Sequence, residues 1–373
     1  MTARFDVAVI GAGVFGVWTA YFLHKAGLRV TLIDGYGPAN SRSSSGGESR
    51  ITRMAYGDDE LYSRWALQSL PDWLALEQRC GQQLFHRTGV LTFSDDKTQW
   101  VQKSVNVIHR VGGECQHLSA SDLANRFPQI GFKKEESAVF EPNSGALMAR
   151  RAVQLLVEEL IRDGVEYRQA SISQPRGTGP LGASGDETIS AANYVFACGP
   201  WLPKLFPELL ARYIQPVRAE IFFLGIPPGM HDFDPPQMPT WIFMGDENWD
   251  AYGMPNLENR GFKLAVDLLR QPADPDAMDR QTTAPYLQQV RDFVRQRFPL
   301  LANAPIVETR VCQYENTPAH DYLIDQHPQW ENVWMVGGGS GHGFKNGPAL
   351  GAYVSDLLTK DAQLDPKFRL PVR

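Results

Sequence analysis

A glycine triplet near the N-terminus limits most strongly what this chain can fold into. The apolar run at residues 7–10 leads into Gly11-Ala12-Gly13-Val14-Phe15-Gly16, and apolar residues then recur at helical spacing until Gly27. A second apolar run, residues 30–33, ends on Asp34. This pattern predicts a strand, a tight turn, a helix and a second strand.

Each residue type in this unit suits a bound dinucleotide. Gly11 permits the tight turn, Gly13 lets the backbone approach a pyrophosphate, and Gly16 brings helix and strand together. The helix N-terminus offers free N–H groups to phosphates, and Asp34 can accept hydrogen bonds from ribose hydroxyls. Because strand, helix, second strand and acid follow in order, chance placement of the glycines is disfavoured. The motif does not distinguish NAD from FAD.

Composition narrows the class of protein. The chain has 373 residues, which suits two intertwined domains, and its 43% hydrophobic and 21% charged content is that of an ordinary globular protein. A net charge of −6 offers no basic field for nucleic acid or an anionic membrane. No apolar run approaches the roughly 20 residues that span a bilayer, and no signal-peptide core precedes the first strand. We therefore expect a cytoplasmic protein.

The cysteines are scattered. Cys80, Cys115, Cys198 and Cys312 show no paired spacing, so the sequence indicates neither a disulfide framework nor a zinc site, and no metal is expected.

The remaining patterns predict a discontinuous architecture. Helices are expected at residues 60–79 and 149–162, a strand at 88–93, and buried strands at 194–197 and 333–336. The last of these precedes a second glycine-rich turn, residues 337–345, whose following helix can point its N-terminus at the cofactor. Between residues 221 and 304, aromatic strands such as 221–224 and 241–244 alternate with proline loops. This alternation predicts an antiparallel sheet that forms the wall of a substrate cavity.

The predicted fold class is therefore α/β (α+β). We expect a Rossmann-like dinucleotide-binding domain from residues 1–85, 146–215 and 306–373. An inserted antiparallel-sheet substrate domain is expected from residues 86–145 and 216–305.

Four segments together resemble the sarcosine oxidase and N-methyltryptophan oxidase group of the D-amino-acid-oxidase-like flavoproteins. They are the Gly11-to-Asp34 unit, Gly47-Glu48-Ser49-Arg50-Ile51-Thr52-Arg53-Met54-Ala55-Tyr56-Gly57, Glu141-Pro142-Asn143-Ser144-Gly145, and the stretch from Val311-Cys312-Gln313-Tyr314 to Ser340-Gly341-His342-Gly343-Phe344-Lys345. The likeness spans nearly the whole chain in the same order. It implies FAD as the cofactor, and in particular a flavin joined covalently to the sulfur of Cys312. A merely buried cysteine is the alternative.

The resemblance also implies roles near the flavin. Lys263 matches a lysine over one face of the ring that assists the reaction with oxygen, and Arg50 matches an arginine beside it. Alternation along its strand would equally allow Lys263 to face solvent. Further cofactor contacts are implied for Val14, Phe15, Ser44, Gly341, Gly343 and Lys345.

Substrate contacts follow from the same resemblance. Arg53 and Lys345 match the pair that holds the substrate carboxylate, and Tyr252 and Tyr314 match tyrosines of the cavity. Two cations that converge on a small cavity need an anionic ligand, because unpaired buried charge is costly. This favours an amino-acid-like substrate.

The chain departs from the family pattern at Asp267, which replaces a histidine four residues after the lysine, and at Ser45-Gly46, which replaces a histidine pair. A carboxylate at position 267 favours a protonated or hydrogen-bond-donating substrate nitrogen, or a hydroxyl-rich extension. Alternatively, Asp267 pairs with a nearby arginine and never meets substrate. These departures leave open whether sarcosine itself is the substrate.

We expect an oxidase, monomeric or weakly associating, that oxidises the C–N bond of an N-substituted or cyclic amino acid to an imine and reduces oxygen to hydrogen peroxide. Within this class the alternatives are an oxidase of fructosyl amino acids and a tailoring oxidase of cyclic imino acids such as pipecolate or piperideine carboxylate. Outside it, the alternatives are a flavin dehydrogenase with another electron acceptor, a NAD-linked enzyme and a ligand-binding protein without turnover.

Overall fold

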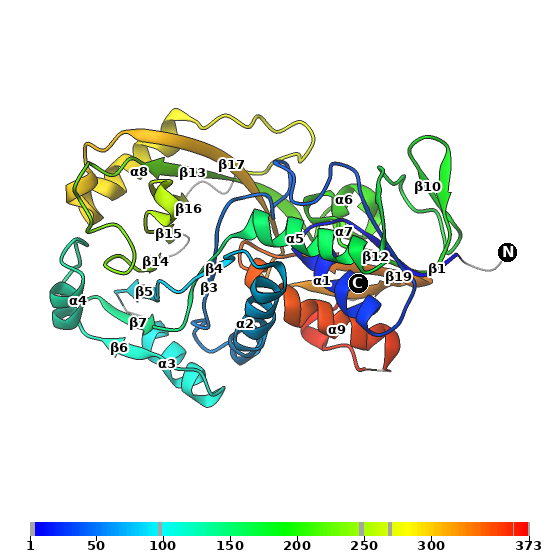
Figure 1. Cartoon of the computed structure of the whole chain (residues 1–373), viewed down its shortest axis with the longest axis horizontal. Helices are drawn as coiled ribbons and strands as arrows, with labels where there is room; N and C mark the ends of the chain where they lie inside the picture. The colour runs from blue at the N-terminus through cyan, green and yellow to red at the C-terminus, as the bar shows by residue number, and fades with distance from the viewer. Residues whose placement is uncertain (1–3, 96–98, 246–249, 268–270, 361, 372–373) are drawn as a thin grey trace.

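A computed structural model describes the chain over residues 4–95, 99–245, 250–267, 271–360 and 362–371. The chain forms two lobes, side by side along the long axis of the molecule (Figure 1). None of the helices in this described part combines the length and apolarity needed to cross a bilayer.

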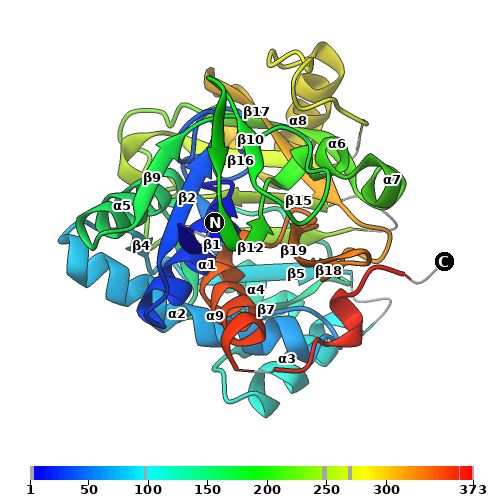
Figure 2. The same ribbon diagram turned by 90° about the vertical axis from the view of Figure 1, so that its right-hand side faces the viewer.

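A six-stranded sheet organises the right-hand lobe of Figure 1. Its strands, in spatial order, are β18 (Leu323–His327), β19 (Trp330–Gly337), β12 (Ala191–Phe196), β1 (Phe5–Ile10), β2 (Val30–Asp34) and β9 (Glu166–Gln169). Neighbours from β19 to β9 are parallel, and β18 is antiparallel to β19. Figure 2 shows this order running from β9 on the left to β18 on the right. The predicted Rossmann-like sheet is confirmed.

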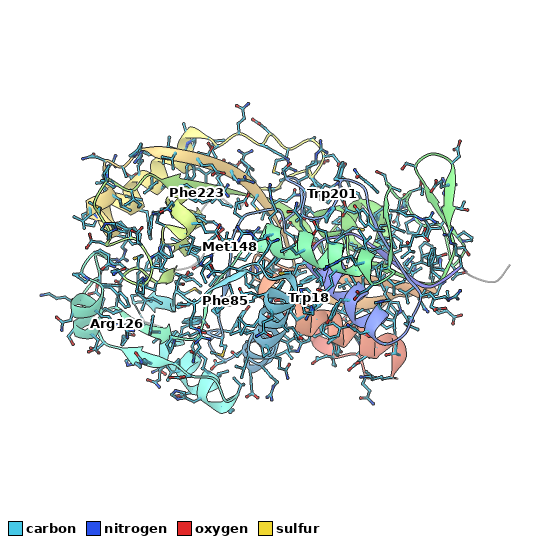
Figure 3. All side chains as sticks on the ribbon, in the orientation of Figure 1. Trp18, Phe85, Arg126, Met148, Trp201 and Phe223 are labelled. Atoms are coloured by element: carbon cyan, nitrogen blue, oxygen red, sulfur yellow. The ribbon has the colours of Figure 1, made fainter. Side chains whose placement is uncertain are left out.

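Apolar layers cover both faces of this sheet. One face packs against α1 (Val14–Lys25), α2 (Glu60–Cys80), α5 (Ala149–Arg162) and α9 (Gly347–Thr359). The other packs against α6 (Leu202–Leu205), α7 (Pro207–Leu210) and the hairpin of β10 (Leu181–Ala183) and β11 (Glu187–Ile189). Trp18, labelled in Figure 3, is fully buried in the first layer with its ring centroid 5.1 Å from that of Trp73. This apolar core holds the turn after β1 in a fixed place.

The left-hand lobe is built on an eight-stranded sheet. Its strands, in spatial order, are β17 (Ile306–Asn316), β13 (Gln215–Leu224), β16 (Phe262–Asp267), β15 (Asp250–Met254), β14 (Thr240–Met244), β5 (Val90–Ser94), β7 (Ser137–Glu141) and β6 (Gln116–Leu118). Helices α4 (Ala120–Arg126) and α8 (Ala284–Arg297) pack on one face, and α3 (Trp100–Arg110) packs near β7. The opposite face carries Ala265, Tyr252 and Cys312.

Short elements connect the lobes. A three-stranded sheet joins β3 (Arg50–Thr52), β8 (Gly145–Leu147) and β4 (Phe85–His86). Just after it, Met148 lies where the two lobes meet (Figure 3), and its amide donates to the Leu84 carbonyl at 2.7 Å. Five 3₁₀ turns complete the described part: η1 (Gly199–Trp201), η2 (Leu257–Asn259), η3 (Pro299–Leu301), η4 (Phe344–Asn346) and η5 (Pro366–Phe368).

Two expectations need correction. The cavity-wall sheet is mixed rather than purely antiparallel, because β14 and β5 pair in parallel. The strand expected at 221–224 begins earlier, at Gln215, since Arg218 is buried beside Glu220 and pairs with it at 2.9 Å. For the domains, we propose the division stated above with β17 shared, because this strand belongs to the second sheet while its last residues reach the cleft of the first.

Candidate active site

The first glycine-rich turn lies at the carboxyl ends of β1, β2 and β12. The Gly11 amide donates to the Ile33 carbonyl at 2.7 Å, which ties the turn to the second strand. A Cβ atom on Gly11, whose φ is +108°, would lie 2.3 Å from the Ala197 carbonyl oxygen, and one on Gly16 would lie 1.8 Å from that of Gly11. Only glycine fits at these two positions, as the motif predicts.

Asp34 connects the tip of β2 to this turn. Its Oδ2 accepts from the Ala12 amide and its Oδ1 from the Tyr36 amide, both at 2.8 Å. Burial raises the pKa of this carboxyl above its ordinary value, although the amides oppose that shift. The Ser45 hydroxyl accepts from the Val14 amide at 3.0 Å in the first turn of α1. The predicted acid and the predicted helix N-terminus are thus adjacent.

A first cavity of about 390 Å³ opens beside this turn. The predicted cofactor residues that line it are Gly11, Gly13, Val14, Phe15, Asp34, Ser44, Arg50, Gly341 and Gly343. Gly16 lies behind the turn, and Cys312 and Lys345 are outside the lining. A helix N-terminus, an acid at a strand tip and two glycine-rich turns around one elongated space fit a dinucleotide such as FAD.

A second cavity, of about 580 Å³, adjoins the first. Both cavities share Arg50, Tyr314, Ser340, Gly341 and Phe344 in their lining. Four residues predicted to contact substrate line it: Arg53, Lys345, Tyr252 and Tyr314. The structure therefore brings together, in one space beside the dinucleotide cavity, side chains that are almost three hundred residues apart in sequence.

Arg50 and Cys312 are in contact. Arg50 Nη2 lies 3.6 Å from Cys312 Sγ, and the guanidinium also donates to the Ser44 and Ser49 carbonyls. Cys312 is 8% exposed, and its Sγ also lies 3.9 Å from the Ser44 carbonyl oxygen. All four cysteines are unpaired thiols.

Lys263 is buried, which excludes the solvent-facing alternative. It is 3% exposed, and its Nζ donates to the Ser49 carbonyl at 2.9 Å and to the Ser49 hydroxyl at 3.1 Å. Burial, together with the nearby Arg50 guanidinium, holds the pKa of this ammonium well below its usual range. Lys263 is not in the lining of either cavity, but Met254, its partner across the strands, lines the second.

Arg53 and Lys345 converge on the ring of Tyr56. The Arg53 guanidinium carbon lies 4.3 Å and the Lys345 Nζ 4.8 Å from the ring centroid. Lys345 donates to the His342 carbonyl at 2.8 Å, and burial beside Arg53 holds its pKa well below the usual range. Arg53 Nη1 is buried without a hydrogen-bond partner in the described part of the chain. An unsatisfied guanidinium nitrogen beside a second cation is a site for an anion.

Backbone contacts fix the segment that carries Arg53. The buried Glu141 carboxylate accepts from the Met54 amide at 2.7 Å and the Ala55 amide at 3.0 Å. The Ser144 hydroxyl donates to the same carboxylate at 2.8 Å. Burial raises the pKa of Glu141, and its charge lies close to Arg53.

A hydrogen-bonded aromatic cluster supports Tyr56. Its hydroxyl lies 3.1 Å from His342 Nδ1, as does the Tyr322 hydroxyl. His342 Nε2 lies 2.8 Å from the His320 carbonyl, an acceptor, so this nitrogen carries the proton and Nδ1 accepts. Burial and the Lys345 charge hold the pKa of His342 well below its usual value. A neutral His342 of defined tautomer therefore accepts the Tyr56 hydroxyl proton in a hydrogen bond.

Other predicted residues lie at the sheet side of the second cavity. The hydroxyls of Tyr252 and Tyr314 are 3.1 Å apart. Asp267 ends β16 opposite Asp250, which lines this cavity, but the Asp267 side chain lies outside the described residues. Within those residues, no cluster of histidine, cysteine and acidic side chains suits a metal ion.

Sequence reasoning missed Tyr56, His342 and Glu315. Tyr56 follows Arg53 by three residues within a segment already singled out, and His342 lies between Gly341 and Gly343. Glu315, beside Tyr314, lines the first cavity. Their proximity to predicted residues was the available signal.

Comparisons with known proteins follow this geometry. A family model described as FAD dependent oxidoreductase matches residues 6–357. Peroxisomal sarcosine oxidase of Homo sapiens is 30% identical over an alignment of 379 positions, which covers 98% of this chain and 94% of the relative. N-methyl-L-tryptophan oxidase of Yersinia pestis is 29% identical over 371 residues, which cover 96% and 95%.

A solved structure has the same fold. The open form of NikD, described as an unusual amino acid oxidase essential for nikkomycin biosynthesis, superposes with a TM-score of 0.79 at 22% identity. The match covers 97% of this chain and 95% of that one. At this identity the likeness concerns the architecture.

Proposed function

The chain belongs to the FAD dependent oxidoreductase family, and we propose that it oxidises the C–N bond of an N-substituted or cyclic amino acid to an imine, with oxygen reduced to hydrogen peroxide. The relatives support this class, since one is named for sarcosine and another for N-methyl-L-tryptophan.

One observation carries the proposal: Arg53, whose Nη1 has no hydrogen-bond partner among the described residues, and Lys345 line the same cavity beside the dinucleotide cavity. Two cations that meet one aromatic ring, one of them the buried Lys345, repel each other unless an anion lies between them. A substrate carboxylate satisfies both, so the ligand is an acid. The adjoining first cavity then fixes which side of the acid meets the cofactor.

The side chains act by positioning. FAD, when bound, accepts a hydride equivalent from the substrate carbon and passes electrons to oxygen. Arg53 and Lys345 hold the carboxylate, Tyr252 and Tyr314 bound the sheet side, and Arg50 with Lys263 supplies positive charge at the flavin end.

A peroxide assay over matched amines tests this function. We expect peroxide with N-methyl, N-fructosyl or cyclic amino acids, and much less with the corresponding primary amino acids or with the same secondary amines lacking the carboxylate. Substrate bleaching of the flavin without air, but no peroxide in air, would identify a dehydrogenase. A panel without bleaching of any kind would contradict the proposal.

The flavin is proposed to be covalent through Cys312, whose sulfur lies 3.6 Å from Arg50 Nη2. After denaturation in acid we expect the yellow colour to stay with the wild-type polypeptide and to pass into the supernatant for Cys312→Ala. A thiolate is the nucleophile that forms such a bond, and no other side chain replaces it in that variant.

Cys198 provides the matched control, because it lines the first cavity but donates to the Ile10 carbonyl at 3.3 Å. Cys198→Ala should keep the flavin bound. Colour lost from Cys198→Ala and kept by Cys312→Ala would reverse the assignment.

Tyr56 is expected to support substrate binding indirectly, because the face of its ring contacts Arg53 and Lys345. Tyr56→Leu should raise KM by about thirtyfold, because two desolvated cation–π contacts are lost at about 1 kcal/mol each. Tyr56→Phe keeps the ring and should change KM by less than about threefold. Steady-state kinetics measure both, with thermal unfolding as the check on folding. An equal rise of KM in Tyr56→Phe and Tyr56→Leu would assign the role to the hydroxyl instead.

We further propose a cytoplasmic monomer. One chain lines both cavities, and unpaired cysteines suit a reducing compartment. Size-exclusion chromatography with light scattering tests the monomer.

A further inference from the structure

Glu315 is a buried acid at the wall of the first cavity. It is 7% exposed and lies in β17 next to Tyr314. Its Oε1 accepts from the Gly339 amide at 3.2 Å. Its Oε2 is buried and has no hydrogen-bond partner in the described part of the chain. A carboxyl oxygen left in this state is costly unless a ligand satisfies it.

The surroundings leave little that stabilises a negative charge. Close approach is possible because neighbouring residues are glycines: Cβ atoms added to Gly199 and Gly337 would lie 3.6 Å and 3.4 Å from Oε2. The Cys198 thiol, in the turn after β12, lies close enough to Glu315 and Asp34 that the charges of both carboxyls raise its pKa. The elements α1 and α6 contribute the apolar Phe15 and Leu202. Glu315 forms no ion pair with any described residue.

Glu315 therefore keeps its proton to a higher pH than an exposed glutamate does. Burial raises its pKa to about 7, although the amides of Gly338 and Gly339 oppose this shift. A protonated carboxyl differs from a carboxylate in having an O–H donor. Since Oε1 already accepts from Gly339, the proton belongs on Oε2, the atom without a partner.

We propose that Glu315, which lines the first cavity, is a cofactor-binding residue whose protonated carboxyl group donates a hydrogen bond to an oxygen of FAD there. The inference rests on the FAD dependence of the chain. FAD is rich in acceptor oxygens along its phosphates and ribityl chain, and a Cβ atom on Gly339 would lie 3.6 Å from Phe15 in the first turn of α1, the predicted phosphate site. A carboxylate at this place would repel the phosphates, whereas the neutral acid pairs with them.

The proposal couples FAD binding to a proton. Bound FAD favours the protonated acid, so it raises the pKa of Glu315 above its value in the FAD-free protein. Below about pH 7 the acid is protonated with or without FAD, and affinity is constant. Above it, binding must take up a proton, so the affinity falls as pH rises, approaching tenfold per pH unit.

FAD titration of the full-length chain tests this without any substrate. In a Cys312→Ala background, which makes binding reversible, the flavin-stripped protein is titrated with FAD between pH 6 and 9 by flavin fluorescence. With Glu315 present, we expect Kd to rise towards tenfold per unit above about pH 7. Glu315→Gln keeps a donor at every pH, so its Kd should stay flat and within a few fold of the value at pH 6. Glu315→Leu should bind at least tenfold more weakly at pH 6.

The controls separate the possible failures. Cys198→Ala should keep the pH dependence, which excludes the neighbouring thiol as its source. The same pH slope in Glu315→Gln would overturn the proposal, and Asp34 would then be the titrating group. Should Glu315→Leu not fold by circular dichroism, the comparison with Glu315→Gln alone decides. Failure to bind FAD at any pH would refute the proposed function, whereas tight, pH-independent binding refutes only the role of Glu315.

Discussion

Replacing Lys263 by Met is expected to slow the reaction of the reduced enzyme with oxygen by about 10²–10³-fold while flavin reduction by substrate continues. Lys263 is buried and donates to both oxygens of Ser49, so its ammonium is held in one place close to Arg50, which lines both cavities. Charge develops there when oxygen takes an electron, and a fixed cation in a water-poor site stabilises it. Stopped-flow mixing of reduced enzyme with oxygen measures the rate.

The pH profile gives an independent check. Because the pKa of Lys263 lies well below its usual range, the ammonium loses its proton at a lower pH than an exposed lysine. The oxygen reaction of the wild-type enzyme should therefore slow as pH rises through that lowered pKa, and Lys263→Met should lack this limb. Ser49→Ala keeps the carbonyl contact and serves as the matched control. An unchanged oxygen rate in Lys263→Met would mean that another group supplies the charge.

The part of the fold that sequence reasoning predicted is the part governed by local pattern. The unit from β1 to β2 and helix α5 follow from apolar periodicity, glycine placement and helix ends, all within about 30 residues. The start of β13 was missed because Arg218 reads as exposed, whereas Glu220 neutralises it inside the sheet. β3, β4 and β8 were missed because strands of two or three residues carry too little pattern.

Lys263 shows where alternation alone is insufficient. In β16 its neighbours Phe262 and Leu264 pack against the core beneath α8, so Lys263 lies on the opposite face of the sheet. Whether that second face meets water depends on the segment around Ser49, which is over two hundred residues away in sequence. Burial of Lys263 is thus a tertiary fact that the strand cannot encode.

The candidate site was partly predicted, and the reason differs from residue to residue. The resemblance named Arg53 and Lys345, and the structure brings both to the second cavity, while their role as carboxylate ligands stays a prediction. Tyr56 and Glu315 were missed because their significance lies in what surrounds them. A tyrosine becomes a platform only when two cations meet its ring, and a glutamate becomes a neutral donor only when glycines from distant turns enclose it.

Arg53→Met is expected to raise KM for a carboxylate-bearing substrate by about 10²-fold or more, with kcat changed far less. Removing one partner of a desolvated charge pair costs about 2–5 kcal/mol. Arg53 Nη1 has no hydrogen-bond partner among the described residues, and we expect a bound carboxylate to supply one. Steady-state kinetics with one N-substituted amino acid measures the effect, and an unchanged flavin spectrum shows that the first cavity is intact.

The matched substrate locates this interaction. A secondary amine that lacks the carboxylate has nothing for Arg53 to hold, so wild type and Arg53→Met should oxidise it with similar kcat/KM. For the carboxylate-bearing substrate, the KM of Arg53→Lys should lie between those of the wild type and Arg53→Met. An ammonium keeps the charge but loses the planar pair of donors. Lys345→Met should mirror Arg53→Met, and the double variant should lose less than the sum of the two because both act on one anion. If Arg53→Met lowered kcat/KM equally for the amine and the amino acid, the role of the arginine would be to support the cavity wall through Tyr56. The substrate carboxylate would then bind elsewhere.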